Sequence, residues 1–161
     1  MDKPVRKANR LPCFDYSSAG VYFITACTKN KECILSEIVG GGALDAPYVK
    51  LSAAGKIVEK YIGSSEKING IHVDNYVIMP NHIHLLIRVE SSGTSRAPSP
   101  TNQIIPHYMS TLKRFVNRDL GENIFQRSFH DHVVRGQADY LEIWEYIENN
   151  PLSWTEDCFY S

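Results

Sequence analysis

Hydrophobic and polar positions along the chain alternate with the periods of strands and helices. Runs rich in β-branched and aromatic residues predict strands over residues 20–28, 33–39, 48–50, 71–79, 82–89 and 129–134. Apolar residues with helical spacing predict helices over residues 52–61, 103–117 and 138–149. Ser52 can cap the first of these helices, and Pro151 ends the last.

The order of these elements predicts an α+β fold. Many of the strands are close in sequence, which favours one mostly antiparallel sheet with helices packed on one face. A length of 161 residues suits a single domain over residues 1–161. The polar residues 91–102 are expected to form a mobile loop within that domain.

Two histidines interrupt the most apolar strand. His82 and His84 flank Ile83, and since side chains alternate along a strand, both imidazoles share one face. Buried imidazoles are costly unless their ring nitrogens have partners, and a metal ion would provide one. An isolated His-x-His is more often two ordinary core or surface histidines, so the pattern needs support from elsewhere in the chain.

Composition excludes several classes of protein. The net charge of −1 does not indicate nucleic-acid binding, although the basic residues gather in segments 1–10 and 107–127 and none follows Arg135. No apolar run is long enough for a membrane span, and no signal peptide is evident, so we expect a soluble, cytoplasmic protein. The four cysteines lack Cys-x-x-Cys spacing and fit reduced, buried side chains.

The last helix carries an aromatic residue outside its apolar stripe. At about 100° per residue, the stripe comprises Tyr140, Ile143, Trp144 and Ile147. Tyr146 lies roughly 110° from the centre of that stripe, so a core role fits it worse than it fits its neighbours. Asn150 and Glu142, each four residues from Tyr146, share its side of the helix.

These side chains offer the parts of a metal-dependent phosphodiester chemistry. A tyrosine alone is a poor nucleophile, because its ordinary pKa is about 10. Beside a divalent cation its phenolate form is favoured and a bound phosphate is polarised. Two histidines with Asn150 or Glu142 could hold the metal, and Tyr146 could attack the phosphate.

The chain resembles the REP-associated tyrosine transposases, within the HUH (His-hydrophobic-His) single-tyrosine transposases. The matching segments, in family order, are 15–17 with 22–25, 79–86, 126–135, 139–140 and 146–151. The resemblance implies a ferredoxin-like or RRM-like sheet with the histidine pair on a central strand. It implies that His82, His84 and Asn150 bind Mg²⁺ or Mn²⁺, and that Tyr146 attacks single-stranded DNA to form a 5′-phosphotyrosine bond.

The resemblance also implies the partner, a single-stranded or hairpin DNA with a palindromic repeat, bound by a monomer or homodimer. Five basic side chains are the candidates for contacts with its phosphates: Lys7, Arg10, Lys113, Arg114 and Arg127. The acidic residues of the last helix would repel that backbone away from the metal.

Two other interpretations stay open at this point. A second His-x-His, His130-Asp131-His132, could join the first in a four-histidine metal site without nuclease activity. Alternatively, an RRM-like sheet could bind nucleic acid without catalysis, although this leaves Tyr146 and the strand histidines unexplained.

Overall fold

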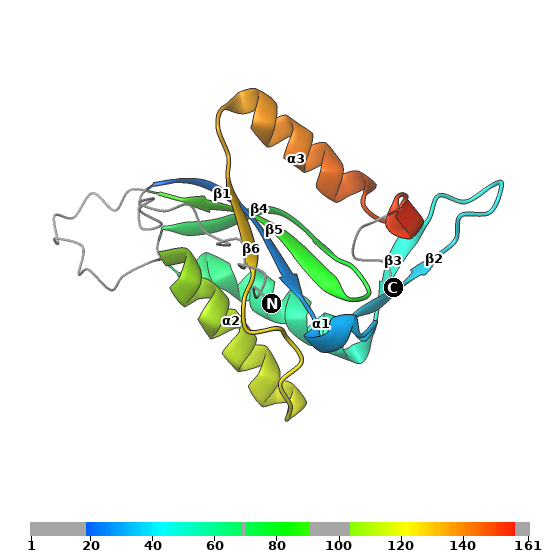
Figure 1. Ribbon diagram of the computed structural model, residues 1–161, viewed down its shortest axis with the longest axis horizontal. Coiled ribbons are helices and arrows are strands. Elements are labelled where there is room, and N and C mark those ends of the chain that lie inside the picture. The colour runs from blue at the N-terminus through cyan, green and yellow to red at the C-terminus, as the bar shows by residue number, and fades with distance from the viewer. Residues whose placement is uncertain (1–18, 69, 91–103, 157–161) are drawn as a thin grey trace, which may run out of the picture.

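A four-stranded antiparallel sheet forms the centre of the molecule in the computed structural model, which describes residues 19–68, 70–90 and 104–156 (Figure 1). The strand order is β4-β5-β1-β6. The bounds are β1 Gly20–Cys27, β4 Ile71–Ile78, β5 His82–Val89 and β6 His130–Val133. A separate hairpin pairs β2 (Ser36–Val39) with β3 (Tyr48–Leu51). The predicted α+β class is thus confirmed.

Three α-helices flank this sheet: α1 Ala53–Gly63, α2 Ile104–Leu120 and α3 Gln137–Asn149. They start and end within about three residues of the predicted bounds, and the Ser52 side chain caps α1 by accepting a hydrogen bond from Gly55 N. Three 3₁₀ turns complete the described part of the chain: η1 Lys29–Lys31, η2 Ser64–Lys67 and η3 Trp154–Glu156. The loop predicted over 91–102 lies outside the described residues.

The helices cover both faces of the sheet, which corrects the expectation of helices on one face. Helices α1 and α2 lie on one side and α3 on the other (Figure 1). One core cluster joins Ile83, Leu85 and Ile87 to the first two helices. A second joins Leu86 to Ile143 and Ile147 of α3. The central strands are apolar on both faces, as the near-complete burial of β5 shows, so each face requires a cover.

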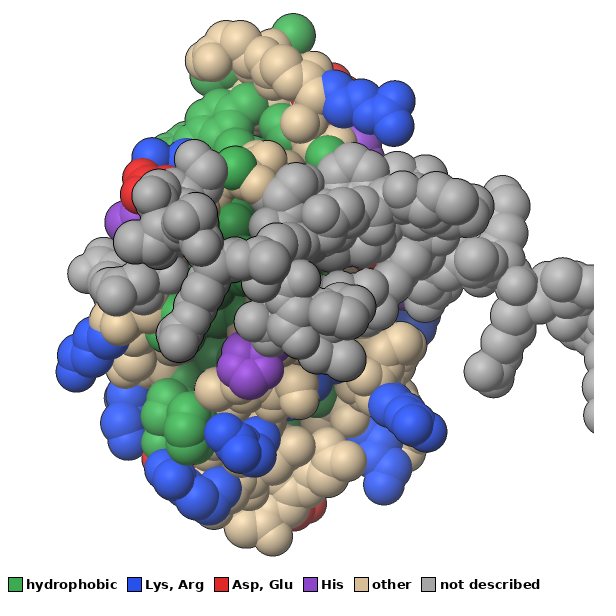
Figure 2. Space-filling view, turned by 90° about the vertical axis from the view of Figure 1, so that its left-hand side faces the viewer, with side chains coloured by type: hydrophobic (Ala, Val, Ile, Leu, Met, Phe, Trp, Pro, Cys, Tyr) green, Lys and Arg blue, Asp and Glu red, His purple; other side chains and the backbone are tan. Residues whose placement is uncertain are grey.

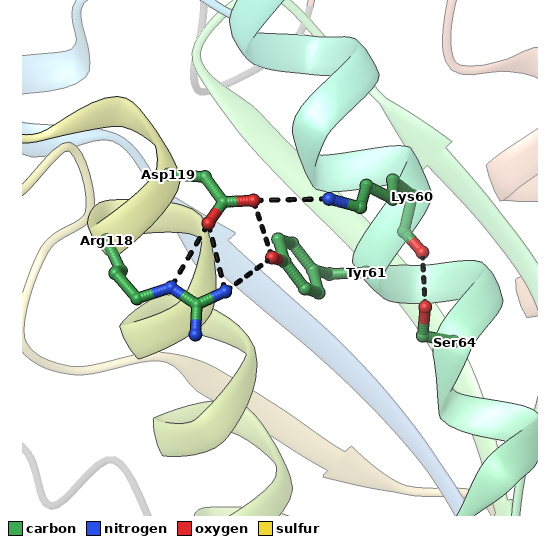
Figure 3. Close-up of polar contacts among 5 residues, drawn as sticks. All are labelled: Lys60, Tyr61, Ser64, Arg118 and Asp119. Atoms are coloured by element: carbon green, nitrogen blue, oxygen red, sulfur yellow. Dashed lines mark hydrogen bonds and ion pairs between the residues drawn. The ribbon is translucent and has the colours of Figure 1, made fainter.

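Helices α1 and α2 are joined by a polar network at the surface (Figure 3). Asp119 accepts hydrogen bonds from Lys60 Nζ and from the Tyr61 hydroxyl, and it pairs with Arg118. The pKa of the Asp119 carboxyl falls to about 2, mainly because Tyr61 and Arg118 donate to it. The Tyr61 ring stacks on Phe115 with centroids 5.5 Å apart. The network therefore fixes the register of two helices that are far apart in sequence.

Helix α1 also approaches the chain before it at Gly55. A Cβ atom built on Gly55 would overlap the backbone carbonyl of Leu35, so only glycine fits there. None of the helices in the described ranges is long and apolar enough to cross a membrane.

Candidate metal and nucleophile site

The histidine pair lies at the start of β5, on the face that α3 covers. The register places His82 opposite Cys27 and His84 opposite Thr25, while Ile83 belongs to the core on the other face. His82 and His84 are 0% and 1% exposed. Their Nε2 atoms are 3.1 Å apart. The strand alternation thus brings two buried ring nitrogens to one point.

The outer nitrogen of each ring has its own oxygen partner. Asn81 Oδ1 lies 2.9 Å from His82 Nδ1, and Thr25 Oγ1 lies 2.7 Å from His84 Nδ1. These contacts direct both Nε2 atoms toward each other. Burial, and secondarily the neighbouring His82, lowers the pKa of His84 well below its ordinary value. His84 is therefore neutral at physiological pH, which is the form that binds metals.

Tyr146 reaches this pair from α3. Ile143 and Ile147 anchor the helix to the sheet, whereas Tyr146 is 43% exposed, as expected for a residue beside the apolar stripe. The Tyr146 hydroxyl lies 3.5 Å from His84 Nε2. Phe23 of β1 holds both rings, stacking on His84 at 5.1 Å and meeting Tyr146 edge-on at 5.9 Å. The aromatic contacts fix the direction of the phenol toward the histidines.

Asn150 follows α3 by one residue and is 2% exposed. It lines a cavity of about 220 Å³ together with Tyr146 and Glu142. Trp154 of η3 lies close to His82, with ring centroids 5.9 Å apart. The end of α3 and the turn after it therefore form one wall of the site.

The donor set fits a divalent cation. Two imidazoles with their Nε2 atoms 3.1 Å apart can offer adjacent lone pairs, and each ring has the oxygen contact at Nδ1 that is usual in metal sites. The Tyr146 hydroxyl lies 3.5 Å from His84 Nε2, and the Asn150 amide lines a cavity together with Tyr146 at the same end of α3. Imidazole suits Zn²⁺ and amide oxygen suits Mn²⁺ and Mg²⁺, so these ligand types fit a divalent cation without selecting one.

The four-histidine alternative receives no support from the geometry. His130 and His132 lie on β6, and β1 separates that strand from β5. His132 Nε2 pairs instead with Asp139, at 3.0 Å. Within the described ranges no group of three or more His, Cys, Asp or Glu side chains could hold a metal.

Three of the five predicted DNA-contact residues lie together on the α2 side of the molecule. Lys113, Arg114 and Arg127 line a cavity of about 590 Å³ between α2 and the segment leading to β6. Figure 2 shows Lys and Arg side chains gathered on the lower part of one side of the molecule, where α1 and α2 lie. Lys7 and Arg10 lie outside the described residues.

Lys113 has a structural role within this cavity. Its Nζ lies within hydrogen-bond distance of the carbonyls of Gln126, Arg127 and Ser128. Burial lowers the pKa of Lys113 to about 8, so it is still an ammonium at neutral pH, with three N–H groups for three carbonyls. Arg114 and Arg127 line the same cavity and are the better candidates for contacts with a bound phosphate.

Sequence reasoning did not identify Thr25 and Asn81. Thr25 is 59 positions from His84, and only the register of β1 with β5 brings them together. Asn81 had a signal, since it directly precedes His82 within the matching segment 79–86, but the sequence predicted no role for its side chain.

Comparison with known proteins places the chain in context. No protein-family model matches it. An uncharacterised protein of Haemophilus influenzae (strain Rd) is 30% identical over 173 residues, covering 96% of this chain and 93% of the relative. The chain belongs to the family of this Haemophilus protein.

A solved structure of a REP-associated tyrosine transposase bound to a REP hairpin superposes with a TM-score of 0.61. It is 17% identical, and the match covers 84% of this chain and 68% of that one. The chain therefore shares the fold of that transposase. The resemblance predicted from the sequence motifs is confirmed at the level of this transposase fold.

Proposed function

We propose that this protein is a transposase-like enzyme that cleaves single-stranded DNA and transfers the strand through a 5′-phosphotyrosine intermediate. One observation carries the proposal. The Tyr146 hydroxyl of α3 lies 3.5 Å from His84 Nε2, which in turn lies 3.1 Å from His82 Nε2. Tyrosine and histidine side chains that only fill the core would not need this contact between Tyr146 and His84, which are 62 residues apart in sequence.

In this proposal His82, His84 and Asn150 hold Mg²⁺ or Mn²⁺. A bound divalent cation would polarise the scissile phosphate and favour the phenolate. The chain's own residues supply orientation. Thr25 and Asn81 direct the imidazoles, and Phe23 directs both the His84 and the Tyr146 rings. Burial keeps His84 neutral and therefore able to donate a lone pair.

Tyr146 carries the covalent step. Its oxygen attacks phosphorus, a bond from phosphorus to Tyr146 forms, and the bond from phosphorus to the 3′ oxygen breaks. The phenol loses one proton and the departing 3′ oxygen gains one, so the number of protons is unchanged. The energy of the phosphodiester is kept in the protein link. Attack by a 3′-hydroxyl on that link then completes strand transfer without a nucleotide cofactor.

The charge distribution favours a DNA substrate that contacts the protein at other phosphates besides the one that is cleaved. Glu142, Glu145 and Glu148 on α3 repel a DNA backbone beside the site. Arg114 and Arg127 line the basic cavity on the α2 side and would bind DNA phosphates there. Because the transposase of the same fold is bound to a REP hairpin, a hairpin with a single-stranded flank is the substrate that we propose.

The test is a covalent complex that survives denaturation. We expect the wild-type protein, incubated with Mn²⁺ and a hairpin oligonucleotide from the inverted repeats near its own gene, to give a protein–DNA band on a denaturing gel. Tyr146→Phe keeps the ring but removes the attacking oxygen, so it should lose the band and still bind DNA. Tyr140→Phe, on the same helix, is the matched control and should keep the band. A wild-type protein that gives only a salt-sensitive complex would contradict the proposal.

A further inference from the structure

The histidine pair is fixed from outside by two buried oxygen atoms. Asn81 is 1% exposed, and its Oδ1 lies 2.9 Å from His82 Nδ1. Thr25 is 5% exposed, and its Oγ1 lies 2.7 Å from His84 Nδ1. The two contacts come from different elements, the turn before β5 and the neighbouring strand β1. Each oxygen contacts Nδ1, the nitrogen that points away from the proposed metal.

The Asn81 side chain is aimed by a well-defined backbone. Its carbonyl accepts from Thr28 N at 2.8 Å and lies 3.0 Å from Thr28 Oγ1. Gln126 in turn binds the end of β1, with its N donating to Cys27 O and its Nε2 donating to Thr28 O. The turn that carries Asn81 is therefore held to β1 and to the segment before β6. The backbone from which the Asn81 amide reaches His82 is therefore held in place.

The Asn81 contact selects one tautomer of His82. An amide oxygen only accepts, so His82 must carry its proton on Nδ1, and its Nε2 then presents a lone pair. His84 reaches the same tautomer when its Nδ1–H donates to the Thr25 hydroxyl. Two Nε2 lone pairs 3.1 Å apart repel each other unless a cation lies beside both. In this arrangement Asn81 and Thr25 accept from both Nδ1–H groups, so the outer contacts prepare the pair for a cation.

We propose that Asn81 and Thr25 are positioning residues, which set the affinity of His82 and His84 for a divalent cation by fixing their Nδ1–H tautomers. This inference rests on the proposed function, because it assumes that the pair binds metal. Outer contacts of this kind typically change metal affinity by about 10–100-fold. This positioning role differs from a merely structural role, in which the two side chains would only fill space or stabilise the turn.

The experiment measures Mn²⁺ binding directly, by the electron paramagnetic resonance signal of free Mn²⁺ titrated with full-length protein. Asn81→Leu keeps the approximate volume but removes the acceptor, and we expect the affinity to fall by about 10–100-fold. Asn81→Asp keeps an acceptor oxygen and should restore the affinity to the wild-type value or above it. Thr25→Val should likewise weaken binding, and Thr25→Ser should restore it.

Ser36→Ala is the matched control, since Ser36 is buried and donates to Ile78 O at 2.9 Å away from the site. It should lower the melting temperature without changing the Mn²⁺ affinity. Rescue by Asp and Ser separates positioning from folding, because a structural role would follow the melting temperature of each variant.

Three results would overturn the inference: wild-type affinity in Asn81→Leu, equal loss in Asn81→Asp and Asn81→Leu, or no Mn²⁺ binding by the wild-type protein. The last would overturn the proposed function as well. A protein that binds Mn²⁺ with the expected variant pattern but forms no covalent complex would support the positioning role and contradict the proposed cleavage.

Discussion

The two faces of the sheet do different work with different side chains. The face covered by α3 contains two almost fully buried histidines. Helix α3 itself is acidic and carries the partly exposed Tyr146. On the side of α1 and α2 the polar groups are at the surface, where Lys60, Tyr61, Arg118 and Asp119 form one network (Figure 3). The α3 face therefore holds a buried site, whereas the α1 and α2 face presents charged groups to solvent.

This difference suggests a division of roles. A buried imidazole pair is suited to holding a cation, and its contacts allow little variation in geometry. Exposed cations bind a phosphate backbone through screened, additive interactions. Substitutions on the α3 face should therefore abolish chemistry, whereas substitutions on the α2 face should weaken DNA binding gradually.

The largest effect is expected from His84→Ala. Loss of one metal ligand should reduce DNA cleavage by about 10³-fold or more, because both the cation and the direction of the phenol depend on it. Arg114→Ala should change cleavage at saturating DNA by less than about threefold. Single-turnover cleavage of the hairpin measures both. Comparable losses of DNA cleavage in the two variants would contradict the division of roles between the two faces.

Metal binding should stabilise the fold through the α3 face alone. At a Mn²⁺ concentration 100-fold above the dissociation constant, the free energy of unfolding should rise by about 2.7 kcal/mol. His82→Ala should cancel this gain, and a protein with both Arg114→Ala and Arg127→Ala should retain it. Thermal unfolding with and without Mn²⁺ checks the prediction. A gain that persists in His82→Ala would place the cation elsewhere.

Lys113 is an exception to this division of roles, because it is a basic residue on the α2 side that has a structural role. Lys113→Met leaves three carbonyls without their ammonium donor, so the free energy of unfolding should fall by about 1–3 kcal/mol. Arg114→Met, at the next residue and exposed, should change it by less than about 0.5 kcal/mol. Urea denaturation followed by circular dichroism compares the two. Equal stabilities would mean that Lys113 is an ordinary surface cation.

The smallest effect concerns the salt dependence of DNA binding. If Arg114 and Arg127 each neutralise one phosphate, replacing both with Gln should lower the slope of log affinity against log salt concentration by about 2. The affinity itself should fall about tenfold near physiological salt. Fluorescence anisotropy with a labelled hairpin measures the slope, and Lys50→Gln, whose partner is Glu37 on the β2–β3 hairpin, is the control. An unchanged slope would mean that DNA binds on another surface.

The sequence predicted those parts of the molecule that depend on local periodicity. Strands β4 and β5 match residues 71–79 and 82–89 to within one residue, and the alternation placed His82 and His84 on one face. The angular position of Tyr146 beside the apolar stripe agrees with its 43% exposure. These features follow from the geometry of single elements, which a sequence shows directly.

Features that depend on two distant elements could not be predicted. The contact between Thr25 and His84 needs the register of β1 with β5, and the contact of Lys113 with three carbonyls needs the path of residues 126–128. The position of α3 on the opposite face was also missed. An apolar strand that is buried on both sides does not indicate which helix covers which side.

The identity of the residue that is covalently linked to DNA tests most directly whether Tyr146 is the nucleophile. The covalent complex formed with Mn²⁺ and hairpin DNA would be digested with nuclease and trypsin, and the peptides analysed by mass spectrometry. We expect a nucleotide 5′-phosphate attached to Tyr146. An adduct on any other side chain, or a linkage that persists in Tyr146→Phe, would contradict it.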